Sequence, residues 1–500
     1  GMLLSSNTNA NKEVQDVEKL FIFDTRLGQR EDNEHEKILF YYPASSQQDQ
    51  QCSDVGLVEA LINFTKTFSP DRPCNAVHTE QTRQAIWEPE PNLWVVIVVK
   101  TSRGTRKDAD GFVDHDLSDE VLDSTLRNAY EMFVLFHGPF ERVIKNESVD
   151  VLRRKLSLFF PPFIATIPPT TKLDLTYSLR GIRYFPVDRQ TYLSLQSFFH
   201  FAQQDFRCLK YGLCMFKDML VWNSLPETSD LSSLYNYLVA HVSSDNTGLL
   251  KWRSQSVPPV KDPDAQPIFS PYNRSWILPL DLKTFTTQQM SNIASKMPMV
   301  FLNNQSQEDA CECKLVVFRN NHALWCFLLD QSESTENGSL LHQLALFVQG
   351  PISSFDSTLT SLESRSQIHA EEPYRYLYFN HMNLALKDSL KQGGGQKTFT
   401  LSKELQSLLL EMHSSLREGH GPWRLRAESK EGEDGEEEEQ KGSSAVTEIC
   451  VKTSTDGWVV GRRSNGRELF VISENKNSNL VEVNEEVERI TGNYFSNIFM

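Results

Sequence analysis

Residues 37–100 carry apolar segments of two kinds in a fixed order, and this order limits the possible folds more than any other feature of the chain. KILFYYP at 37–43 and LWVVIVVK at 93–100 are short apolar runs, as is typical of buried strands. Residues 77–87 read as a further strand. Residues 54–68 have the spacing of an amphipathic helix. A strand, a helix and two more strands in close succession predict an α+β domain.

The predicted helix at 54–68 has one apolar face. Asp54 is a suitable N-cap residue, and Pro70 and Pro73 end the segment. Large apolar residues recur at i, i+4, i+7 and i+11, at Leu57, Leu61, Phe64 and Phe68. Because this is one face of a 3.6-residue period, we expect it to pack in the domain core.

Shifts in composition divide the chain into three units. We predict these units at 19–165, 176–365 and 371–500. In the first, strands are expected at 19–25 and 37–42, and helices at 118–137 and 149–160, with a boundary at 161–169. The polar residues 1–18 and the acidic insertion 428–444 are predicted to be disordered, because they contain too few apolar side chains to form a core.

The second and third units repeat the same mixture of elements. GIRYFPVD at 181–188 opens the second unit, followed by a helix at 189–206 and a closing helix at 339–362 that breaks near Gly350–Pro351. The third unit has helices at 401–416 and 484–495. Tight hairpin turns are expected at Lys217–Asp218, Asn320–Asn321, Asp456–Gly457 and Asn465–Gly466. Periodicity therefore predicts several α+β domains in series.

Charge and apolar content exclude several functions. The net charge of -16 argues against nucleic acid as the main partner, because phosphate binding needs a basic surface. No apolar run approaches the roughly 20 residues that cross a bilayer, and the N-terminus lacks the pattern of a signal peptide. The eight cysteines are scattered without a CxxC pair, which indicates a reducing, cytosolic compartment.

Motifs for covalent chemistry and for cofactors are absent from the sequence. It contains no Walker A loop, no GxGxxG after a strand, no GxSxG and no HExxH. The acidic stretch 106–120 resembles a calcium loop, but Arg106 and Leu117 occupy its first and last ligand positions. The twelve histidines form no cluster with metal-ligand spacing. We therefore expect no catalytic residue, no cofactor and no metal.

Three long stretches resemble one family. They are the segment 37–100, YLYFNHMNLALK at 376–387 and ELFVISENKNSNLVEVNEEVERI at 468–490. The sequences of these stretches and their order along the chain are similar to those of the Ccz family. Members of this family form one subunit of the Mon–Ccz guanine-nucleotide exchange factor of late endosomes and lysosomes. The resemblance implies three longin domains in series and an obligate heterodimer with a Mon-type subunit. It also implies activation of a Rab-seven-class GTPase without covalent chemistry, by a cytosolic complex recruited peripherally to late endosomal and lysosomal membranes.

The resemblance also implies where partners bind. Longin domains pair through the first helix and the strand beside it, so the candidate residues for contact with the Mon-type subunit or the Rab are Phe64, Lys66, Thr67, Phe68, His78, Glu80 and Arg83. Core packing is the alternative for the two phenylalanines, and simple solvation is the alternative for the polar residues. Arg462, Arg463 and Arg467 are candidates for contact with an anionic, phosphoinositide-containing membrane, with a solvated hairpin tip or a protein contact as the alternatives. The third domains of the two chains are also expected to pair, and in animals a third, regulatory subunit is expected to join there.

Two other function classes fit the same sequence. A non-catalytic longin adaptor in a membrane-trafficking complex shares the fold, the compartment and the lack of motifs. An enzyme of unrecognised type would need a nucleophile–base pair or a metal set, and the sequence offers neither. Only the family-like stretches favour the exchange factor over the adaptor.

Overall fold

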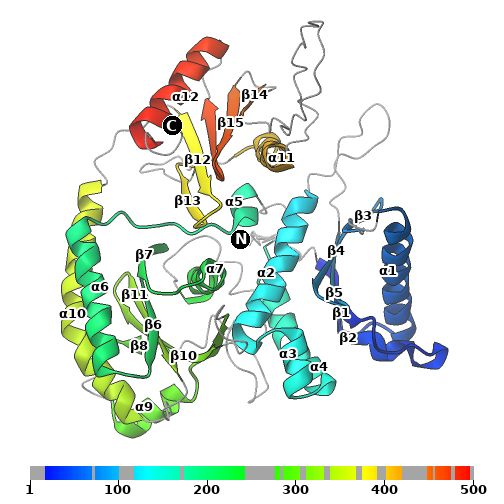
Figure 1. Cartoon of the computed structure of the whole chain (residues 1–500), viewed down its shortest axis with the longest axis horizontal. Helices are drawn as coiled ribbons and strands as arrows, with labels where there is room; N and C mark the ends of the chain where they lie inside the picture. Colours follow the sequence, from blue (N-terminus) through cyan, green and yellow to red (C-terminus); the bar gives the residue numbers. More distant parts are fainter. Residues whose placement is uncertain are drawn as a thin grey trace, which may run out of the picture.

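The computed structural model places three sheets in series, each with its own helices (Figure 1). The described residues are 17–69, 74–100, 118–168, 174–242, 276–281, 285–303, 311–330, 338–366, 374–390, 401–418, 448–453, 457–473 and 479–495. Among the described helices, none combines the length and the apolar composition that crossing a bilayer requires.

The first domain is an antiparallel five-stranded sheet with helices on both faces. Its elements are β1 (Val17–Asp24), the 3-10 helix η1 (Glu31–Lys37), β2 (Ile38–Tyr42), α1 (Gln48–Phe68), β3 (Ala76–His78), β4 (Thr82–Glu90), β5 (Leu93–Lys100), α2 (Asp119–His137), α3 (Phe140–Asn146) and α4 (Val149–Ile164). The strand order is β2-β1-β5-β4-β3. The predicted strands at 19–25, 37–42 and 93–100 and the helix at 118–137 are confirmed within a residue or two, whereas α3 was not predicted.

Three local predictions in this domain are wrong. α1 begins at Gln48, and Asp54 lies inside it, where its carboxylate accepts hydrogen bonds from Lys19 Nζ (2.8 Å) and the Tyr41 hydroxyl (2.5 Å). Residues 77–87 belong to two strands, because a turn after His78 folds β4 back onto β3. α4 continues past residue 160 to Ile164 despite two prolines, since its apolar face stays buried beyond that point.

The two faces of the first sheet support different layers. Phe21, Phe23, Trp94 and Val96 pack with the buried residues of α1. Leu20, Ile22, Val95 and Ile97 belong instead to the core that contains the buried residues of α2 and α4. Since neighbouring strand residues point to opposite faces, this explains the unbroken apolar run of β5. α1 and α2 therefore lie on opposite sides of the sheet (Figure 1).

The second domain has a six-stranded sheet. Its elements are α5 (Leu175–Leu179), α6 (Arg189–Asp205), β6 (Leu209–Phe216), β7 (Met219–Asn223), α7 (Thr228–Tyr237), the π-helix η3 (Leu238–Val242), β8 (Leu278–Pro279), α9 (Thr287–Ala294), β9 (Met299–Leu302), β10 (Cys311–Asn320), β11 (Ala323–Asp330) and α10 (Gly338–Ser366). The strand order is β7-β6-β11-β10-β8, and β9 pairs with β10. The predicted break near Gly350 is wrong. α10 runs through Pro351, and Val348 and Ile352 on either side are fully buried.

The third domain repeats the architecture of the first. Its elements are β12 (Tyr374–Asn380), β13 (Ala385–Asp388), α11 (Lys403–Glu418), β14 (Glu448–Lys452), β15 (Trp458–Ser464), β16 (Arg467–Ser473) and α12 (Leu480–Phe495), with strand order β13-β12-β16-β15-β14. The predicted turn at Asn465–Gly466 is confirmed, with φ of 48° and 71°. Asp456 and the acidic insertion 428–444 lie outside the described residues, as do residues 1–16 and the calcium-like positions 106–117.

The first, second and last strands are connected in the same way in all three sheets, although the second sheet adds β9 and pairs β8 parallel with β10. In each, the first strand forms a hairpin with the second and lies beside the last strand of the sheet, giving the pairs β1–β5, β6–β11 and β12–β16. The prediction of three α+β units of one design in series is confirmed by this repeated strand order.

The segment after α5 joins the second and third sheets. Ile182 exchanges backbone hydrogen bonds with β13, from its amide to Leu384 (2.7 Å) and from Leu386 back to its carbonyl (2.8 Å). Three residues later, the Phe185 amide donates to the carbonyl of Leu220 in β7 (2.8 Å). The GIRYFPVD segment, predicted to open the second unit, is therefore a backbone bridge between two domains.

Candidate functional site

The outer face of α1 carries exposed apolar side chains. The side of the helix that faces the sheet is formed by Val55, Val58 and Ile62, all buried. Leu57, Phe64 and Phe68 are 60%, 62% and 74% exposed. The predicted core face of this helix is therefore wrong, because a second apolar row of β-branched residues packs on the sheet instead.

We call Leu57, Leu61, Phe64 and Phe68 the outer ridge. The rings of Phe64 and Phe68 meet edge to face with centroids 5.0 Å apart, so they form one continuous apolar surface. Leu61 lies half-buried beside them. Their spacing along α1 places them on one face of the helix, as in helices that dock by one face.

The two polar candidates at the end of α1, Lys66 and Thr67, lie on different sides of the helix. Lys66 is exposed, and its Nζ lies 5.3 Å from the centroid of the buried Trp94 ring. The hydroxyl of Thr67 donates to the carbonyl of Phe64 (2.6 Å). The amide of Cys74 donates to Thr65 Oγ1 (3.0 Å), which fixes the chain that leaves the helix. Thr67 therefore borders Phe64 and Phe68, whereas Lys66 lies on the side of α1 that carries Val55 and Ile62 and faces the sheet.

The other first-domain candidates face the opposite side of the sheet. His78 pairs with Arg83 across β3 and β4. His78 Nε2 lies 2.7 Å from Asp119 at the start of α2, and Arg83 Nη1 lies 3.3 Å from the same carboxylate. Since α2 covers the face away from α1, these two residues do not extend the outer ridge. Glu80 is exposed in the turn between the two strands.

The candidate arginines of the third domain have partners within that domain. Arg462 donates to Glu448 and to Glu488, both at 2.7 Å. Arg463 Nη1 donates to the carbonyl of Leu416 (2.7 Å). Arg467 is half-buried at the start of β16. The hairpin that carries these residues is as predicted, and its contact with a membrane stays a prediction.

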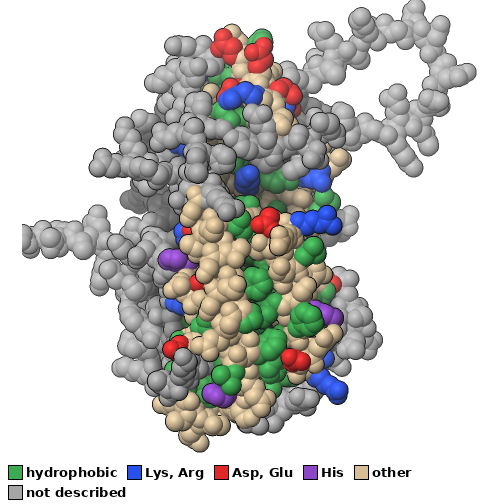
Figure 2. Space-filling model, turned by 90° about the vertical axis from the view of Figure 1, so that its left-hand side faces the viewer, with side chains coloured by type: hydrophobic (Ala, Val, Ile, Leu, Met, Phe, Trp, Pro, Cys, Tyr) green, Lys and Arg blue, Asp and Glu red, His purple; other side chains and the backbone are tan. Residues whose placement is uncertain are grey.

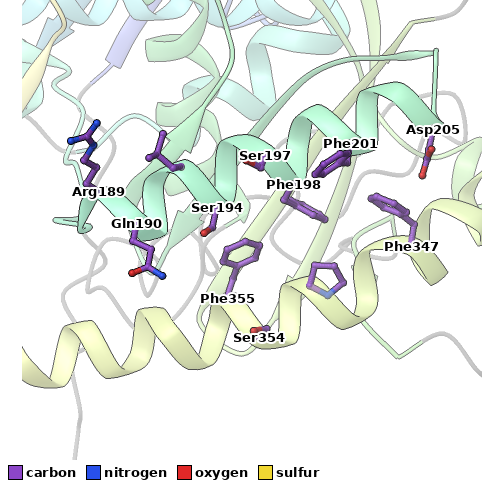
Figure 3. Close-up of a pocket in the computed structure, with 12 residues that line it drawn as sticks. Arg189, Gln190, Ser194, Ser197, Phe198, Phe201, Asp205, Phe347, Ser354 and Phe355 are labelled. Atoms are coloured by element: carbon purple, nitrogen blue, oxygen red, sulfur yellow. The ribbon is translucent and has the colours of Figure 1, made fainter.

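An apolar groove between α6 and α10 was missed by the sequence reasoning. The groove has a volume of about 1010 Å³, and Figure 3 shows Phe198, Phe347 and Phe355 pointing into it from the two helices. Phe201 at its edge is 58% exposed. Apolar side chains gather along this face of the molecule (Figure 2). The helical periodicity of both segments can be recognised in the sequence. The sequence does not show that the two helices pack with a groove between them.

A buried polar cluster in the third domain was also missed. His381 follows β12, His413 lies in α11, and Glu468 lies in β16. Glu468 Oε1 is 2.9 Å from His381 Nε2, and Glu468 Oε2 is 2.5 Å from His413 Nδ1. These residues are 32 or more positions apart in the sequence, so no local spacing could have identified them.

The cluster stabilises positive charge. Burial alone would raise the pKa of Glu468, but hydrogen bonds with His381 and His413 lower it to about 2. Burial would likewise lower the pKa of His413, but hydrogen bonds with Glu120 and Glu468 raise it to about 9. Glu120 belongs to α2, with Oε1 3.2 Å from His413 Nε2, so the cluster also joins the first domain to the third.

Comparisons with known proteins identify the three domains. Residues 17–138 match the family model described as the first longin domain of INTU, CCZ1 and HPS4. Residues 210–349 and 370–490 match Intu longin-like domains 2 and 3. The prediction of three longin domains in series is thereby confirmed.

Full-length relatives carry one name. A protein of Nematostella vectensis called vacuolar fusion protein CCZ1 homolog is 31% identical over 497 residues, covering 98% of this chain and 99% of its own. Proteins with the same name from Xenopus laevis and Dictyostelium discoideum are 32% and 30% identical, and each match covers 96% of both chains.

Proposed function

The chain belongs to the CCZ1 family of vacuolar fusion proteins, and we propose that it is one subunit of a heterodimeric guanine-nucleotide exchange factor. The partner is a Mon-type longin subunit, and the GTPase is of the Rab-seven class. The complex binds peripherally to late endosomes and lysosomes. There it promotes GDP release and so drives endosome maturation and fusion with lysosomes and autophagosomes.

The outer ridge is the observation that carries this proposal. Three large apolar side chains of one helix are more than half exposed on the first longin domain. Covering each of them contributes on the order of 1.5–3 kcal/mol, which favours a protein partner over water. A second longin domain offers a matching helix and sheet edge, so the ridge supports pairing of the two first domains.

Nucleotide exchange suits a chain without a catalytic residue. A GTPase that binds GDP with nanomolar affinity gains about 12 kcal/mol from the nucleotide. An exchange factor offsets that energy by binding the nucleotide-free GTPase more tightly than the loaded one, and by displacing the switch loops. This requires a broad, rigid surface and no covalent step. We place that surface across both first domains, so this chain alone should be poorly active.

The proposal assigns a binding partner to each polar candidate of the first and third domains. Thr67 beside the outer ridge and Lys66 at the end of the same helix contact the Mon-type subunit or the Rab. His78, Glu80 and Arg83 form a separate contact at the β3–β4 edge of the sheet, away from the ridge. Arg462, Arg463 and Arg467 contribute to a surface on the third domain for anionic lipid, and a regulatory subunit joins at the same domain. These roles rest on the resemblance to the family, and Lys66, Thr67, His78 and Glu80 are exposed.

The test is release of fluorescent GDP from the Rab-seven-class GTPase. The rate is measured with this chain alone, with the Mon-type subunit alone and with both together. We expect fast release only with both. Phe64→Ala with Phe68→Ala should raise the heterodimer Kd by at least about 100-fold, equivalent to about 2.8 kcal/mol, and slow release accordingly. The control is Phe201→Ala, a phenylalanine on the second domain that is 58% exposed.

Each outcome separates the competing functions. An unchanged Kd and rate in the double variant would remove the outer ridge from the interface. A stable heterodimer that does not accelerate GDP release would favour the adaptor function. The positive control is the GTPase alone, which should release GDP when its magnesium is chelated. Equal losses in the control would indicate a general effect on folding.

A further inference from the structure

We propose that His381, His413 and Glu468 bind a divalent transition-metal ion of the zinc class at the junction of the third and first domains. The three side chains come from the turn after β12, from α11 and from β16. One ligand atom from each lies within 4.8 Å of the other two. Two imidazole nitrogens and one carboxylate form a donor set that suits zinc in proteins.

Both imidazoles direct a nitrogen at the same carboxylate. His381 Nε2 and His413 Nδ1 lie 2.9 Å and 2.5 Å from the two oxygens of Glu468. Glu468 itself is fully buried, and the nearest guanidinium in the described part of the chain is that of Arg463, at 3.9 Å. The close partners of this carboxylate are therefore two imidazoles. An ion held between the three donors would replace the two hydrogen bonds with metal–ligand bonds.

The surroundings of His413 match those of a metal-binding histidine. Its second nitrogen, Nε2, lies 3.2 Å from Glu120 Oε1, and Arg417 Nη1 donates to the same oxygen (3.3 Å). Metal-binding histidines usually donate their other ring N–H to a carboxylate, which fixes the tautomer and leaves the first nitrogen free for the ion. Glu120 therefore acts as a positioning residue, supplied by the first domain.

Charge and access also favour a small cation. Glu468 and Glu120 place two carboxylates around His413, and Arg417 pairs with Glu120, so Glu468 is the carboxylate that a bound ion would neutralise. The side chain of His381 is 29% exposed, whereas those of His413 and Glu468 are 3% and 0% exposed. An ion would thus enter beside His381, and water from that side would complete a four-coordinate site.

The test is metal binding by the full chain in its heterodimer. The protein is stripped with a chelator and titrated with Zn²⁺ against a chromophoric competitor, and with Co²⁺ followed by visible absorption. We expect one tightly bound ion per cluster and a tetrahedral Co²⁺ spectrum. His381→Ala should weaken binding at least tenfold, and Zn²⁺ should raise the unfolding midpoint of the unmodified protein but not of the variant.

Controls separate this site from other donors. His200→Ala removes an exposed histidine of α6 and should leave binding unchanged. Cys311 and Cys313 are the competing thiols, with sulfurs 3.5 Å apart, so the titration is repeated in Cys311→Ser. Thiolate bands in the Co²⁺ spectrum that vanish in Cys311→Ser would place the ion there and overturn the proposal. Equal binding by His381→Ala would also overturn it, leaving a proton on His413 as the cation of the cluster.

Discussion

At the residue scale, Phe64 shows that helical periodicity alone does not predict which face of a helix is buried. The sequence placed Phe64 and Phe68 on one helical face with Leu57, and that grouping is correct. It also placed this face in the core, and that is wrong, because Val55, Val58 and Ile62 form a second apolar row with the same period. Periodicity identifies rows but not which of two apolar rows meets the sheet. Shape decides here: the smaller, β-branched row lies against the sheet.

At the residue scale, one prediction concerns pH. Burial lowers the pKa of His137 to about 4, with a small contribution from Lys155, and its ring packs on Phe133 with centroids 4.8 Å apart. The unfolded chain has a His pKa near 6.5, so acidification protonates the unfolded state first. Stability is therefore lost between pH 6.5 and 4.

The variant His137→Gln tests this linkage. Between pH 7 and pH 5 the unmodified protein should lose about 1–2 kcal/mol more than the variant, measured from thermal unfolding midpoints at both pH values. His200→Gln, which changes an exposed histidine, is the control. An identical midpoint shift in the unmodified protein and in His137→Gln would show that this ring is accessible to protons when folded.

At the scale of elements, most strands and helices could be predicted and their junctions could not. Hairpins such as the one at Asn465–Gly466 follow from local turn chemistry. The continuity of α10 through Pro351 depends on burial of Val348 and Ile352, which only the fold determines. The bridge at residues 182–185 depends on two sheet edges that both lie more than 30 residues further along the chain, so no local pattern contains it.

Two glycines give opposite predictions for the same substitution. A Cβ on Gly181 would lie 2.5 Å from Leu386 Cβ, so Gly181→Ala should push the bridge away from β13 and cost about 1–3 kcal/mol. Gly56 lies in the exposed part of α1 with open space around it, so Gly56→Ala should add about 0.5–1 kcal/mol through helix propensity. Denaturant unfolding of both variants measures the change in the free energy of unfolding, which should be a loss for Gly181→Ala and a gain for Gly56→Ala. A neutral Gly181→Ala would mean that the bridge gives way without cost.

At the scale of the whole molecule, α2 is the element that joins the domains. Phe136 of α2 meets Tyr237 of the second domain edge to face with centroids 4.8 Å apart, and both are buried. Glu131 of α2 pairs with Arg180 at 2.6 Å, and Glu120 reaches His413 in the third domain. The sequence predicted this helix and its apolar side, but not its contacts with all three domains. Packing against the first sheet alone would require the same apolar pattern.

The apolar part of this junction should dominate its stability. Phe136→Ala removes a buried ring and should cost about 3–5 kcal/mol, separating the unfolding of the first domain from that of the second. Arg142→Ala removes a partly exposed pair with Glu312 at 3.4 Å and a guanidinium contact with the Phe301 ring at 5.1 Å, and should cost about 1–2 kcal/mol, less than the loss of the buried ring. Calorimetry distinguishes the two, since domain uncoupling splits one transition into two. A single transition at an unchanged midpoint in Phe136→Ala would refute this ranking.

The backbone bridge at residues 182–185 has a mechanical consequence. Its main-chain hydrogen bonds to β13 and β7 resist shear, since both sheets must lose them before either can rotate. The second and third domains therefore move together as one rigid body when a force acts on either of them. A pull or tilt applied at the third domain would reach the far end of the chain without being absorbed by a hinge at this joint.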